Sequence, residues 1–111
     1  MEALLYNPKK EPFIVSVENN TSAIRKCLSI YKVDIFTIAQ IEDRKLVVLH
    51  GKPGVLEKDK ISGIYHYDSN SKGKREIFSD KFMVCEYKNK EFMDISSEGI
   101  LIAKKKILIV I

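Results

Sequence analysis

The sequence predicts an α+β domain: a mainly antiparallel β-sheet of five to seven strands with one helix packed on a face. Short apolar segments rich in β-branched and aromatic residues are separated by polar turns, a pattern typical of strands joined by hairpins. One segment near residue 25 instead repeats its apolar side chains at helical spacing. The 111 residues, 45% of them hydrophobic, have the size of a single domain over residues 1–111.

The first two strands are predicted as a hairpin. Residues 2–6 are apolar and end at Asn7-Pro8, and residues 13–18 alternate in character after Pro12. The connection between them is polar and bounded by proline, as expected of a hairpin loop longer than two residues.

A helix is predicted over residues 21–31, with Asn20 or Thr21 as its N-cap. Its apolar side chains recur at helical spacing and are Ile24, Cys27, Leu28 and Tyr31. This spacing gives the helix one apolar face that we expect to pack on the sheet.

Four further strand regions are predicted in the middle of the chain. Residues 33–40 and 45–50 form a hairpin around a charged turn, and the apolar centre of the second segment places this hairpin in the middle of the sheet. Residues 61–67 and 77–87 follow, joined by the most polar segment of the chain, residues 68–75.

The alternation in residues 82–87 predicts which face of that strand is buried. One face carries Phe82, Val84 and Glu86, and the other carries Met83, Cys85 and Tyr87. Because Glu86 is charged, we expect the second face to be the buried one.

The C-terminal part allows two interpretations. Residues 92–93 are predicted as a short strand, and residues 96–98 are suited to cap the start of a helix. In residues 100–111, Lys104–Lys106 fit either a hairpin tip or the polar face of a helix. The β-branched composition of residues 107–111 favours a strand there, and an unpaired edge in that segment would allow a homodimer.

The net charge of +4 is weak support for a polyanionic partner. Lysines account for sixteen of the nineteen basic residues, and the three arginines are Arg25, Arg44 and Arg75. Bidentate contacts to phosphates and bases favour arginine. We therefore interpret most of the lysine excess as genome bias and solubility, with a nucleic-acid footprint as the alternative.

The chain offers few groups for catalysis or for binding a metal. Cys27 and Cys85 are predicted to be inert core thiols, and His50 and His66 to have ordinary strand-end or solvent-facing roles. These four residues include no closely spaced ligand pair of the kind that zinc sites use. The segment around Gly51 lacks the frame of a phosphate-binding loop. We predict no catalytic residues, no metal and no cofactor, and hence no enzyme.

Targeting signals are also missing from the sequence pattern. Residues 1–6 lack a cationic leader, and Asn7-Pro8 interrupts them. Lys104–Lys106 divide the apolar C-terminal tract into pieces too short to span a membrane. The predicted location is the cytoplasm of a bacterial host, with no membrane partner.

Two groups of residues are candidates for contacting a partner. The basic group is Lys72, Lys74, Arg75, Lys88 and Lys90, and the aromatic group is Tyr65 and Tyr67. If the intervening strands are antiparallel and their turns lie at one end, the basic side chains form a patch, and the tyrosines add stacking surfaces for single-stranded nucleic acid. The alternative is a solvated loop beside tyrosines that pack within the sheet.

Residues 1–8 and 11–15, together with Glu18-Asn19 and the helix around residues 22–28, resemble a known family. It is an uncharacterised family of small proteins from phages and conjugative elements of low-GC Gram-positive bacteria, catalogued as a domain of unknown function. The likeness is clearest over residues 1–30, and this chain departs from it in the polar loop 68–75 and in its Ile-rich end.

The resemblance implies that the protein comes from a mobile genetic element, but the family has no known site residues to assign to this sequence. Small proteins of mobile genetic elements often act stoichiometrically on host machinery. We therefore expect a non-enzymatic protein that binds a host protein or protein–nucleic acid complex, as an anti-CRISPR or anti-restriction inhibitor of a host defence complex. The alternative is a nucleic-acid-binding module that uses the basic loops 72–75 and 88–90.

Overall fold

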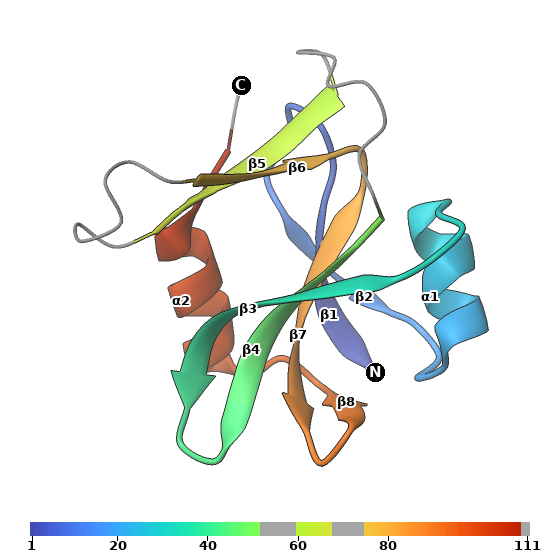
Figure 1. Ribbon diagram of the computed structural model, residues 1–111, viewed down its shortest axis with the longest axis vertical. Helices are drawn as coiled ribbons and strands as arrows, with labels where there is room; N and C mark the ends of the chain where they lie inside the picture. The colour runs from blue at the N-terminus through green and yellow to red at the C-terminus, as the bar shows by residue number, and fades with distance from the viewer. Residues whose placement is uncertain (52–59, 68–74, 110–111) are drawn as a thin grey trace.

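The computed structural model describes residues 1–51, 60–67 and 75–109, and within them it contains nine strands and two helices (Figure 1). The strands are β1 (Glu2–Tyr6), β2 (Phe13–Ser16), β3 (Asp34–Ile41), β4 (Arg44–His50), β5 (Ile61–His66), β6 (Arg75–Ser79), β7 (Phe82–Lys88), β8 (Glu91–Met93) and β9 (Ile107–Leu108). The helices are α1 (Thr21–Leu28) and α2 (Ser97–Lys106). The α+β class and the antiparallel pairing are confirmed.

The strands form two sheets, whereas the sequence predicted one sheet of five to seven strands. The main sheet has the order β2-β1-β7-β4-β3, and β8 pairs with the end of β7. The second sheet has the order β6-β5-β9. Figure 1 shows α2 and α1 on opposite sides of the main sheet, with the second sheet across its top.

Both faces of the main sheet are covered, so the prediction of a single buried face on β7 was wrong. Phe82 and Val84 pack with residues from α2 and the second sheet, and Met83 and Cys85 pack with α1. Glu86, expected at the surface, is 1% exposed. The second apolar layer, which the sequence pattern did not reveal, accounts for its burial.

Glu86 is compensated by two hydrogen bonds. Its carboxylate accepts one from Arg44 Nε and one from the backbone N–H of Ser96, the N-cap of α2. Burial by itself raises the pKa of Glu86, but the hydrogen bonds from Ser96 and Arg44 outweigh burial and leave the pKa below its usual range. The carboxylate thus ties β7 to β4 and to the start of α2.

Helix α1 is shorter than the predicted 21–31. The side chain of Asn20 accepts a hydrogen bond from the Ala23 N–H, so Asn20 is the N-cap. The helix ends at Leu28 because Ser29 adopts a left-handed conformation with φ 56°, and the N–H of Ile30 bonds back to the Arg25 carbonyl.

The predicted strand region 77–87 is two strands in different sheets. Between them, Asp80 has φ 56°, which breaks the extended backbone. The Asp80 N–H donates to the Lys60 carbonyl over 2.6 Å, and the buried Ser62 hydroxyl donates to the Asp80 carbonyl. Hydrogen bonds to residues 60–62, which lie far away in the sequence, therefore stabilise the interruption between β6 and β7.

The C-terminal part contains a helix and then a strand. Lys104–Lys106 form the last turn of α2, so they are not a hairpin tip. Of the two interpretations that the sequence left open for Lys104–Lys106, the helix is the one that the structure shows, and its N-cap is Ser96. Ile107 and Leu108 pair with β5, as the preference for a strand predicted, and residues 110–111 lie outside the described part. Among the described residues, no helix is long and apolar enough to cross a membrane.

Candidate functional site

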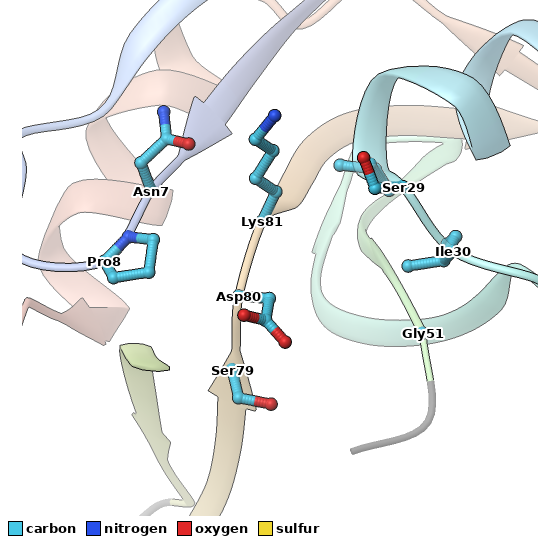
Figure 2. A pocket seen from close by; sticks show the side chains of 9 residues that line it. Asn7, Pro8, Ser29, Ile30, Gly51, Ser79, Asp80 and Lys81 are labelled. Carbon is cyan, nitrogen blue, oxygen red and sulfur yellow. The ribbon is translucent and has the colours of Figure 1, made fainter. Parts of the chain in front are cut away.

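A groove of two adjoining hollows lies beside the C-terminal end of α1. The hollows measure about 360 and 430 Å³ and share Ser29, Ile30, Gly51 and Asp80. Among residues 1–51, 60–67 and 75–109, the lining comes from the loop after β1, the end of α1, the residue after β4, and the turn between β6 and β7. Figure 2 shows this arrangement around the first hollow.

Close packing of backbone against Ile30 shapes one wall of the groove. A Cβ added at Gly51 would lie 2.7 Å from Ile30 Cγ2, a distance that real Cβ atoms do not reach. Glycine therefore lets the chain leaving β4 pass against the end of α1. The left-handed Ser29 turns the chain so that Ile30 reaches this position.

Asp80 supplies a carboxylate on the opposite wall. Its backbone is fixed by the hydrogen bonds to Lys60 and Ser62, and Figure 2 shows its side chain on the side of the turn that faces Ile30 and Gly51. Within the described part of the chain, the Asp80 carboxylate has no ion-pair partner. A rigid turn thus presents a negative charge to the groove.

The remaining lining mixes cations with neutral and apolar groups. Lys81 lines the first hollow and Lys32 the second, while Pro8 and Leu28 add apolar surface. Tyr31 lines the second hollow with 95% of its surface exposed. From the part of the chain that the structure describes, the groove therefore receives one carboxylate, two ammonium groups and an exposed aromatic ring within a small area.

The two tyrosines predicted to contact a partner lie in an aromatic cluster between the sheets. The Tyr65 and Tyr67 rings are 5.4 Å apart, and both meet Phe36 edge to face at 5.4 and 6.0 Å. The Tyr67 hydroxyl donates to Glu76 over 3.1 Å. Both residues are partly buried; Tyr65 packs against the core cluster between the sheets, and Tyr67 contacts it through Phe36.

The predicted basic residues are divided between the two sheets. Arg75 begins β6 in the second sheet and is exposed, whereas Lys88 ends β7 in the main sheet and forms a 2.5 Å ion pair with Asp43. That hydrogen bond also lowers the pKa of Asp43. Lys90 lines a separate hollow of about 340 Å³ beside the start of α1. Lys72 and Lys74 lie outside the described residues.

The remaining candidates for chemistry have structural surroundings. Cys85 is fully buried, and burial raises the pKa of its thiol to about 12, as expected of an inert core thiol. Cys27 is half-buried against the α1 side of the core. His50 bonds to the Gly51 carbonyl and meets Phe78 edge to face at 5.1 Å. Within residues 1–51, 60–67 and 75–109, no three His, Cys, Asp or Glu side chains are grouped as metal ligands.

The sequence interpretation missed the groove entirely. Tyr31 was assigned to the apolar face of a longer helix, and Asp80 to the middle of one strand region. A signal was present in Ser79-Asp80-Lys81, three polar residues between two apolar segments, which is a turn pattern. No local signal marks the meeting of this turn with the end of α1.

Comparison of the chain with protein-family models, with curated proteins and with solved structures finds no match.

Proposed function

We propose that this chain is a non-enzymatic protein-binding module whose contact surface is the groove beside α1 together with Tyr31. The observation that carries the proposal is the position of Tyr31, a tyrosine 95% exposed at the rim of a hollow that also contains the Asp80 carboxylate. Tyrosine is enriched among the residues that contribute most to binding energy at protein interfaces. When a partner covers such a ring, apolar contact area is buried and little side-chain conformational entropy is lost.

The lining also indicates the chemistry of the partner. Asp80 would accept a hydrogen bond from an Arg or Lys side chain, while Lys32 and Lys81 on either side favour neighbouring acidic groups. We therefore propose a protein segment with a basic side chain flanked by acidic ones. Following the family resemblance, the proposed partner is a component of a host defence complex, such as a restriction or CRISPR nuclease, which the bound chain inhibits.

The test is a cleavage assay with purified nucleases of both kinds from a low-GC Gram-positive host. Increasing amounts of the chain are added to each nuclease and plasmid DNA, and the complex is isolated by size-exclusion chromatography. We expect stoichiometric inhibition of one nuclease, and we expect Tyr31→Ala combined with Asp80→Lys to weaken binding at least tenfold.

Lys45→Ala serves as the matched control, because Lys45 is exposed on β4 away from the groove. A complex that forms equally well with the groove variant would overturn the assignment of the surface. Unchanged cleavage by every nuclease, without complex formation, would overturn the proposed inhibition.

A further inference from the structure

Strand β2 is an outer strand of the main sheet, and within the described residues it pairs only with β1. The other outer strand, β3, is partly covered. There, the Ile38 carbonyl accepts hydrogen bonds from the Tyr65 hydroxyl and from Lys106 Nζ, each over 3.5 Å. Among the described residues, the edge of β3 is therefore covered only at Ile38, whereas the edge of β2 is uncovered along its length.

The hydrogen bonds of the hairpin show which backbone groups of β2 point outward. Met1 and Val17 exchange both of their N–H···O bonds, over 2.8 and 2.9 Å. Bonded and non-bonded pairs alternate in an antiparallel ladder, so Val15 and Phe13 also point their backbone groups toward β1. The N–H and C=O groups of Ile14 and Ser16 consequently point away from β1, along the open edge.

Apart from Ser16, the side chains of this edge are apolar, and they lie on both faces of the sheet. Phe13 lies opposite Leu5 on the α1 face and is 48% exposed, while Ile14 lies opposite Leu4 on the other face and is 44% exposed. Residues 13–17 carry no charge. Protected edge strands usually contain a charge or an interior proline that prevents pairing, and Pro12 stands just before this one.

We propose that β2 pairs antiparallel with β2 of a second copy of this chain, about a two-fold axis at Val15. This register gives the greatest overlap of the segment 13–17 with itself. It places Ile14 opposite Ser16 of the second copy and, by symmetry, Ser16 opposite Ile14. Each of these two pairs exchanges two N–H···O bonds, so four backbone hydrogen bonds form across the axis. The two main sheets then join into one continuous sheet.

The charges around the segment fit a second copy. In this register Glu18 faces Pro12 of the other copy and Glu11 faces Asn19, so no like charges stand opposite each other. Phe13 faces Val17 of the other copy, and this contact covers the exposed ring. The surface differs from the C-terminal segment in which the sequence predicted a homodimer, where Ile107 is already buried and paired with β5.

The first test is light scattering during size-exclusion chromatography of the whole chain at about 100 µM, enough to populate even a weak dimer. We expect twice the monomer mass. Ser16→Pro removes an outward N–H that β1 does not use, so the fold should survive while the mass falls to that of a monomer. Ser16→Thr keeps the N–H and should remain dimeric.

The second test fixes the register. Val15 would form a non-hydrogen-bonded pair with itself across the axis, a geometry that suits a disulfide. In a Cys27→Ser background, Val15→Cys should form a cross-linked dimer under mild oxidation, and Thr37→Cys on exposed β3 should not. A monomeric wild-type chain, a dimer that persists in Ser16→Pro, or equal cross-linking at both positions would overturn the proposal.

Discussion

Replacing Glu86 with glutamine tests the buried polar tie between the main sheet and α2. The carboxylate is 1% exposed and accepts hydrogen bonds from Arg44 Nε and from the Ser96 N–H. Glutamine keeps the shape but has one oxygen and one NH₂ group. Arg44 and Ser96 both donate hydrogen bonds at this position. Whichever way the amide is oriented, one of them must therefore face the glutamine NH₂, which is also a donor.

The cost follows from these contacts. Losing a hydrogen bond to a charged group costs about 1.5–3 kcal/mol, and leaving a buried donor unpaired costs about 1–3 kcal/mol. The Arg44 side chain is 22% exposed, so water can partly solvate it, which favours the lower part of the sum. We expect the free energy of unfolding to fall by about 3 kcal/mol, a large fraction of the stability of a small domain.

The assay is urea unfolding followed by circular dichroism. With an m-value of about 2 kcal/mol/M, the expected loss lowers the midpoint by about 1.5 M. Glu42→Gln is the matched control, because Glu42 is 79% exposed and lies 3.8 Å from the same arginine, so its loss should cost under about 0.5 kcal/mol. Equal midpoints for the two variants would refute the structural role assigned to Glu86.

The difference in unfolding free energy between wild type and Glu86→Gln should also depend on pH. The hydrogen bonds hold the pKa of Glu86 in the folded chain below the ordinary value of 4.5, so the folded state favours the ionised form. The stabilisation is fully present above pH 4.5 and is lost as the pH falls through the folded pKa. The difference between wild type and Glu86→Gln should therefore shrink below about pH 4.5. A difference that grows on acidification would contradict this assignment.

Three other outcomes are expected. Gly63→Ala should lower the melting temperature, because the added Cβ would lie 2.7 Å from Ile107 Cγ2. Overpacking of this kind costs about 1–3 kcal/mol. An unchanged melting curve would contradict this close packing. Tyr6→Phe should leave the midpoint of urea unfolding unchanged or raise it, since the buried Tyr6 hydroxyl has no hydrogen-bond partner among the described residues. A midpoint that falls strongly would show that the hydroxyl does have a partner. In a gel-shift assay at about 50 mM salt, single-stranded DNA should not be retarded; a shift that salt abolishes would favour the alternative function of the basic loops 72–75 and 88–90.

Local patterns were sufficient to predict most strands of the first half of the chain but not their places in the sheet, because the hairpin of β3 and β4, predicted in the middle, has β3 as an outer strand. Apolar alternation and the prolines around the loop predicted the hairpin of β1 and β2 to within two residues at each end. The break at Asp80 could not be predicted in this way, because it depends on hydrogen bonds to Lys60 and Ser62, about twenty residues earlier. Merging β6 and β7 into one strand region concealed the second sheet, and with it the burial of Glu86.

The candidate site was harder to predict than the fold, for a related reason. Each segment of the groove carries ordinary local signals: a proline loop, a helix end, a glycine and a polar turn. Their meeting depends on the packing of α1 against the main sheet and on the turn at Asp80. Tyr31 shows the difficulty, because its spacing fits the apolar face of α1 until the left-handed Ser29 ends the helix before it.

The groove therefore depends on the second sheet, although no residue of β5 or β9 lines it. Ser62 is fully buried, and its hydroxyl, together with the Lys60 carbonyl, fixes both backbone polar groups of Asp80. The second sheet thus sets where the carboxylate stands relative to Ile30 and Gly51 in the main layer. A partner that binds Asp80 and Tyr31 together would bind only when the two layers are correctly packed, so binding energy at the groove also stabilises the contact between the sheets.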